Sequence, residues 1–90
     1  MNKAIIIKLI KHYENLIETL TPAYNNANEA FQLSYKKLYE PTITDDEFDI
    51  RMEQWEECEK NYHKIAEEII MYDDIILSLK DALNLISKVE

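Results

Sequence analysis

The 90-residue chain contains no glycine, and this absence restricts the backbone more than any other feature of its composition. Tight β-hairpins of the Asn-Gly or Asp-Gly kind need positive φ angles, which glycine adopts without steric cost. Proline is also scarce, with Pro22 and Pro41 as its two occurrences. A chain rich in Ile, Leu, Glu, Lys and Tyr with so few turn residues is typical of an all-α protein.

Cysteine is equally rare. The single Cys58 excludes an internal disulfide and a cysteine-based zinc site. Lys8 interrupts the apolar run that precedes it, and no stretch approaches the roughly 20 apolar residues that span a bilayer. We therefore expect a cytoplasmic protein without membrane association. The abundance of Ile, Lys, Asn and Tyr suggests an AT-rich genome, such as that of a low-GC bacterium or its phage.

Acidic residues far outnumber basic ones in the second half of the chain, and the net charge is −8. Residues 1–40 carry five Lys and four Glu, whereas residues 41–90 carry fourteen acidic and five basic side chains. An acidic surface repels nucleic acid and favours basic protein partners. We therefore expect no direct binding to nucleic acid.

A heptad repeat of apolar residues is the clearest pattern that is present. Two series recur every seven residues with only Arg51 interrupting them, namely Phe48, Trp55, Tyr62, Ile69, Ile76 and Leu83, and Cys58, Ile65, Tyr72, Leu79 and Ile86. More than five heptads without Gly or Pro predict one long, coiled-coil-like helix over about residues 45–88.

The first half shows the same spacing, in Ile6, Leu9, Tyr13, Leu16, Leu20, Tyr24, Ala27, Phe31 and Leu38. The pattern stays in phase across Pro22, although proline inside a helix costs about 3 kcal/mol and kinks it. We favour a helix over about 3–39 that is kinked near Thr21. Thr21 and Pro22 also fit the N-cap and N1 positions of a new helix. The alternative is a loop at 21–26, with Asn26 and Glu29 forming a cap pair, which would give three separate helices.

The stretch between these patterns, residues 40–44, predicts the turn. Thr44 fits an N-cap, and Glu47 three residues later completes a capping box. Ile43 and Phe48 occupy the positions of a hydrophobic staple. The carboxylates of residues 45–47 complement the helix dipole by about 0.3–1 kcal/mol each, so we interpret them as structural rather than as a metal site. The predicted fold is an all-α long helical hairpin, one domain over 1–90, that associates into a helical bundle.

Two surfaces of the second helix are candidates for binding. Apolar residues outside the heptad series, with Ile70, Ile75, Leu77 and Leu85 as the main ones, form a stripe too wide for one neighbour. This stripe predicts a homo-oligomer, with a dimer favoured, or a protein partner. The second candidate is an acidic face for a basic or nucleic-acid-binding protein, formed by Asp49, Glu53, Glu56, Glu57 and Glu59.

Residues for chemistry are few. Glu59 and His63 share a helix face, but the Glu-x-x-His spacing of carboxylate-bundle metal sites is missing. We predict no metal, no cofactor and no catalysis. A candidate pocket for a small anionic ligand combines aromatic and basic side chains, namely Lys8, Lys11, His12, Tyr13 and Tyr24.

These observations favour a small acidic protein that acts by protein–protein binding, as an inhibitor, adaptor or antitoxin-like protein. A special case is DNA mimicry against a host enzyme, with carboxylates in place of phosphates. One alternative is an oligomer that sequesters an anionic molecule such as a nucleotide. Another is a purely structural assembly subunit.

Overall fold

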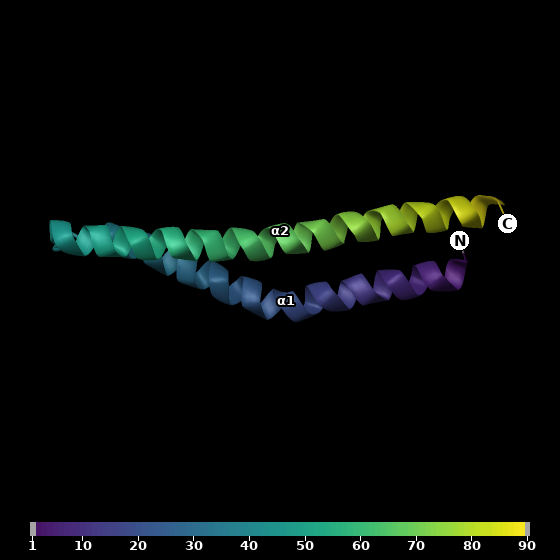
Figure 1. The fold of residues 1–90 in the computed structure, drawn as a ribbon, viewed down its shortest axis with the longest axis horizontal. Helices are drawn as coiled ribbons and strands as arrows, with labels where there is room; N and C mark the ends of the chain where they lie inside the picture. Colours follow the sequence, from purple (N-terminus) through teal and green to yellow (C-terminus); the bar gives the residue numbers. More distant parts are fainter. Residues whose placement is uncertain (1, 90) are drawn as a thin grey trace. The chain divides into compact units, whose positions relative to one another are not determined.

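The computed structural model describes residues 2–89, and these residues form two helices and no strand (Figure 1). Helix α1 spans Lys3–Leu38 and helix α2 spans Asp45–Val89. The prediction of an all-α protein with two long helices is confirmed. The predicted ends at residues 39 and 88 differ from the observed ends by one residue each.

Helix α1 begins at an asparagine cap and continues without a break through Pro22. The Ala4 N–H donates to Asn2 Oδ1 at 2.8 Å, which satisfies one of the first free backbone donors of the helix. The predicted alternative of a loop at 21–26 is wrong. Thr21 caps nothing, because its hydroxyl donates to the Ile17 carbonyl one turn earlier at 2.8 Å. This bond adds a donor in the turn where proline supplies none.

Helix α2 begins as its sequence predicts. The Glu47 N–H donates to Thr44 Oγ1 at 3.2 Å, and the Phe48 N–H donates to the Thr44 carbonyl at 2.9 Å. Thr44 is therefore the N-cap. Within residues 2–89 the reciprocal half of the capping box does not form, because the Glu47 carboxylate lies 4.0 Å from Arg51 Nη2 instead. The staple between Ile43 and Phe48 stays a prediction.

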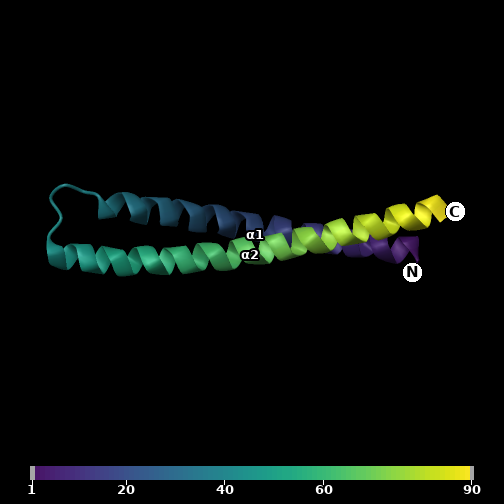
Figure 2. The same ribbon diagram turned by 90° about the horizontal axis from the view of Figure 1, so that it is seen from above.

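The turn between the helices contains no glycine. No residue in the described range 2–89 has a positive φ angle, so α1 does not end in the left-handed cap that glycine usually provides. Arg51 Nη1 of α2 instead donates to the Lys37 carbonyl and to Glu40 Oε2, both at 2.8 Å. The one polar interruption of the heptad series thus caps the last turn of α1 and joins it to α2. Figure 2 shows the loop that connects the two helices.

The chain divides into two compact units, each built from a part of both helices. The terminal unit contains residues 2–21 and 67–89, and the turn unit contains residues 22–66. In each unit the two helical segments pack along one line of contacts, which we call the seam. The prediction of a single domain stays a prediction.

The seam of the terminal unit is aliphatic. Ile6, Ile10 and Ile76 are buried together, and partly buried residues pack around them, namely Tyr13, Ile17, Leu79, Ala82, Leu83 and Ile86. The prediction is wrong at two positions of α1, because Ile10 and Ile17 occupy the core where Leu9 and Leu16 were expected. Both choices fit alternating spacings of three and four residues.

The seam of the turn unit is aromatic. The Phe31 ring centroid lies 5.9 Å from that of Trp55 and 5.4 Å from that of Tyr62. The two neighbours of Phe31 along the α1 seam, Ala27 and Ser34, are small and buried. Small side chains at these positions leave room for the large rings of α2. The heptad pattern of Trp55 and Tyr62 therefore marks a core, as the sequence predicts.

Candidate functional site

In each unit, the residues that flank the seam form two opposite faces. A groove of about 520 Å³ in the turn unit is lined by residues from both helices that directly precede a seam residue, such as Leu33, Lys37, Gln54 and Glu57. We call this side of a unit the pre-seam face. The residues that directly follow a seam residue form the post-seam face. The two helices of a unit are antiparallel, so equivalent flanking positions of both helices share one face.

The post-seam face of the turn unit contains a cavity of about 430 Å³ with aromatic walls. Its lining consists of Asn28, Phe31, Gln32, Tyr35, Lys36, Trp55 and Tyr62. The seam supplies three of the four rings, and α1 adds Tyr35, which is half-exposed. The cavity therefore presents ring faces and edges to solvent beside two amide side chains.

Carboxylates follow the α2 side of this cavity. Asp49, Glu56 and Glu59 each directly follow a seam residue, so they lie on the same face as the cavity. Glu59 Oε1 lies 3.7 Å from His63 Nε2. Asp49 and Glu56 are exposed and form no ion pair with any residue in the range 2–89. We call the cavity with these three carboxylates the acid–aromatic face.

Two polar features lie in the walls of the cavity. Trp55 Nε1 is buried and has no hydrogen-bond acceptor among residues 2–89, and an unpaired buried donor costs about 1–3 kcal/mol. The Tyr62 hydroxyl lies 3.0 Å from the Tyr24 hydroxyl. This hydrogen bond, followed by partial burial and the nearby phenol, raises the pKa of Tyr62 above its ordinary value near 10.

Of the five acidic residues predicted to form one face, Asp49, Glu53, Glu56 and Glu57 are exposed across the solvent side of α2, and Glu59 is half-buried beside His63. Glu57 lines the groove on the pre-seam face, and Glu53 precedes Gln54 on the outer side of α2. Consecutive helical residues are separated by about 100° around the axis, at 3.6 residues per turn. Glu56 and Glu57 therefore diverge towards different flanks of the seam, although both lie on the solvent side of α2.

The terminal unit has one charged and one apolar face. Its post-seam face holds a groove of about 420 Å³ whose charged lining residues are Glu14, Glu18, Asp73 and Lys80. We call the opposite, pre-seam face of this unit the lateral face. It carries a second series spaced by alternately three and four residues on each helix, namely Ile5, Leu9, His12 and Leu16 on α1 and Met71, Ile75, Ser78, Ala82, Leu85 and Val89 on α2.

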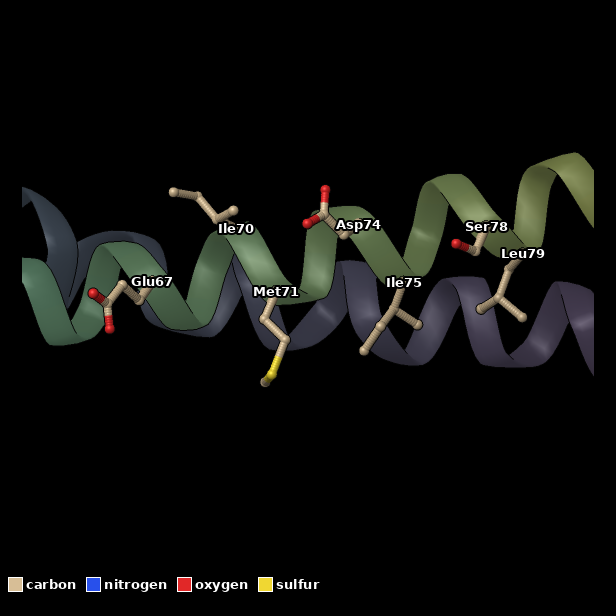
Figure 3. Close-up of a pocket in the computed structure, with 7 residues that line it drawn as sticks. All are labelled: Glu67, Ile70, Met71, Asp74, Ile75, Ser78 and Leu79. Carbon is tan, nitrogen blue, oxygen red and sulfur yellow. The ribbon is translucent and has the colours of Figure 1, made fainter.

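The lateral face is open in this structure. Met71, Ile75 and Leu79 project from α2 to the same side and border a groove of about 510 Å³ (Figure 3). Met71 is 50% exposed and Leu85 is 65% exposed. Glu67 and Asp74 also line the groove, at its outer edge. The face thus combines an apolar centre with an acidic margin on α2.

The predicted apolar interface divides between these faces. Ile75 and Leu85 belong to the lateral face, and Ile70 borders its groove. Leu77 directly follows the seam residue Ile76, so it lies on the post-seam face, where it is 61% exposed. Ile70 directly follows the seam residue Ile69 in the same way, so the predicted residues divide into two pairs, Ile75 with Leu85 and Ile70 with Leu77.

The predicted ligand pocket stays a prediction. Tyr13 lies in the terminal unit, where its ring contacts His12 at 5.3 Å and Tyr72 at 5.7 Å. Tyr24 lies in the turn unit, bonded to Tyr62. Lys8 and Lys11 are exposed. The four cavities described above have none of the five predicted residues in their linings.

Sequence reasoning missed the aromatic cavity, although it placed Phe31, Trp55 and Tyr62 on the seams. A usable signal was Tyr35, an aromatic residue directly after a seam position. Within residues 2–89, no three His, Cys, Asp or Glu side chains are grouped closely enough to hold a metal ion. Neither described helix has an apolar segment of the length needed to cross a membrane.

Comparison with known proteins gave no match: no family model, curated protein or solved structure is significantly similar to this chain.

Proposed function

We propose that this chain is a small, non-catalytic binding protein whose acid–aromatic face recognises a basic protein partner. The observation that carries the proposal is the ring-lined cavity on the same face as Asp49 and Glu56, two exposed carboxylates that have no ion-pair partner among residues 2–89. An arginine or lysine side chain of a partner fits such a site. Its cation gains about 0.5–2 kcal/mol over an aromatic ring face, and Asp49 and Glu56 offer it a counter-charge.

Charge supports the same kind of partner. The turn unit carries ten carboxylates and five basic side chains, a net charge of −5. A field of this sign accelerates encounter with a basic protein. Lys36 is the one cation in the cavity lining, and it is exposed. Its aliphatic stem can line the cavity while its ammonium group stays in water.

Proteins that bind nucleic acid are the basic partners that such a surface suits best, and inhibition of one is the role that we infer. The cytoplasm, and an origin in a low-GC bacterium or its phage, belong to this proposal as predictions from composition.

Trp55 is the one tryptophan of the chain and forms a wall of the cavity, so its fluorescence reports occupancy directly. We expect titration with an arginine-rich peptide to change this fluorescence, with an affinity that falls as salt rises. A neutral peptide of the same length should change nothing. The absence of any change with arginine-rich and lysine-rich peptides at low salt would refute the proposal.

Two matched pairs of variants locate the binding. Glu56→Gln should weaken the peptide up to about fivefold, as expected for one exposed ion pair, whereas Glu57→Gln on the pre-seam face should leave the affinity nearly unchanged. Tyr35→Ala removes a cavity wall, and Leu33→Ala removes a similarly exposed side chain from the opposite face. Equal effects within either pair would show that the peptide is held by net charge alone.

A further inference from the structure

We infer that the lateral face of the terminal unit binds a second copy of this chain, with the two-fold axis parallel to the helices and α1 of each copy on α2 of the other. This inference concerns a different unit from the basic-partner proposal and does not depend on it. Three observations carry it: the exposed area of the chain, the second heptad series of the lateral face, and the charges along its margins.

The chain exposes more surface than a compact protein of its mass. Its accessible surface is 6979 Å². A typical monomer of 10.7 kDa exposes about 5,500 Å². The excess of about 1,500 Å² exceeds the roughly 800 Å² that each partner buries in a standard stable interface. This excess belongs to the whole chain, and exposed apolar side chains of the lateral face such as Met71 and Leu85 contribute to it.

The lateral face has the pattern of a helix-packing surface. On α2 its series continues for six positions with alternating spacings of four and three residues, from Met71 to Val89. Such a series is what a second neighbouring helix requires. Ser78 and Ala82 at the middle of the series are small, so an incoming helix can approach the backbone closely there. The larger apolar side chains of Met71 and Leu85 lie on either side of these two small residues.

The margins of the face are oppositely charged on the two helices. Lys8 lies beside the face on α1, and His12 belongs to it. On α2 the margin carries Glu67, Asp74, Asp81 and Lys88, so it is acidic overall. None of these six side chains forms an ion pair with another residue in the range 2–89.

These charges select one symmetric arrangement. A two-fold axis across the helices would place α2 on α2 and oppose two margins that each carry three acids and one lysine, which is unfavourable. An axis parallel to the helices places α1 of one copy on α2 of the other, at the same height along the unit. The contact of Tyr13 with Tyr72 sets His12 at the height of Asp74 within one copy. In the dimer, His12 of the second copy therefore meets Asp74, and every neighbouring pair of helices is antiparallel.

The test is the mass of the full chain in solution, measured by sedimentation equilibrium over a range of concentrations. We expect a particle of twice 10.7 kDa. Leu85→Glu should weaken the dimer about 10- to 100-fold, the factor expected when a buried leucine is lost. The matched control Leu77→Glu, equally exposed on the same helix but on the post-seam face, should change the dissociation constant about twofold or less. Circular dichroism checks that both variants keep their helices.

A charge exchange tests the orientation. Asp74→Lys should weaken the dimer, and His12→Glu added to it should restore the affinity. Several outcomes would overturn the inference: a monomer at every concentration, equal effects of Leu77→Glu and Leu85→Glu, or a double variant that stays as weak as Asp74→Lys. Peptide titration of Trp55 is unaffected by any of these results, so this inference and the proposed function fail separately.

Discussion

Arg51 offers the sharpest test of how this chain terminates a helix without glycine. Its guanidinium joins the last turn of α1 to α2 through bonds of 2.8 Å to the Lys37 carbonyl and to Glu40. Arg51→Met removes the charge and all donors but keeps a long apolar stem on the seam. The variant therefore isolates the cap from the packing.

The expected loss follows from exposure. The Arg51 side chain is 25% exposed and that of Glu40 is 52% exposed, so their ion pair contributes only about 0.2–1 kcal/mol. A hydrogen bond from a charged donor contributes about 1.5–3 kcal/mol where water is excluded, and less at this partly exposed carbonyl. We expect Arg51→Met to lower the free energy of unfolding by about 1–2 kcal/mol. For a chain of this size, that lowers Tm by about 5–15 °C.

Urea and thermal unfolding followed by circular dichroism measure this loss. All variants must be compared at one protein concentration, because association of the folded state changes apparent stability. Glu40→Gln is the control, since it removes the ion pair and leaves the bond to the Lys37 carbonyl. Glu40→Gln should lower the free energy of unfolding clearly less than Arg51→Met does. Equal losses for the two variants, or none for Arg51→Met, would refute the view that the guanidinium replaces a glycine cap.

Three further substitutions test the helix start, the core and the phenol pair. Thr44→Ala should lower the urea-unfolding free energy by about 1 kcal/mol, because Thr44 is the N-cap of α2, and Thr44→Ser should restore most of it. Ile6→Ala should cost about 2–5 kcal/mol because Ile6 is fully buried, whereas Ile7→Ala, with Ile7 at 45% exposure, should cost less than about 1 kcal/mol in the same assay. The bond to Tyr24 raises the pKa of Tyr62, so its stabilisation is complete below about pH 10 and is lost as pH rises through the raised pKa. Tyr62→Phe should therefore flatten the fall of the urea midpoint above about pH 10, and an unchanged slope would contradict this assignment.

Much of the fold follows from local sequence rules. The cap at Thr44 and the heptads of α2 combine a specific residue type with a specific spacing, and both were predictable. The asparagine cap of α1 was not predicted, although Asn2 has the right type and place. The route of the chain at Pro22 was left open for a physical reason. Proline inside a helix costs about 3 kcal/mol. Packing of the flanking turns against the partner helix can offset a cost of this size, so local sequence rules do not decide between a helix and a loop at Pro22.

The division of each unit into two faces was beyond the sequence. A heptad pattern shows which residues form a seam, but not which flanking residues of two helices share a side. That depends on the antiparallel pairing of the helices and on its register. The cavity at Tyr35 and Trp55 therefore became visible only when residues from α1 and α2 were placed together. For the same reason the sequence does not show that Glu56 and Glu57, adjacent on the solvent side of α2, flank the seam on different sides.

The errors at Leu9 and Leu16 have the same origin and a structural consequence. Each leucine is followed by an isoleucine, and either member of such a pair fits a heptad seam. The position of the partner helix determines which member is buried, and in this structure Ile10 and Ile17 pack in the core. Neighbouring residues on a helix differ by about 100° in direction, so a pair of adjacent apolar residues cannot be buried against one helix. One member of each pair must face a second neighbour or water. Repetition of the pair one heptad apart aligns the two leucines on the lateral face, which is why α1 carries a second apolar series as α2 does.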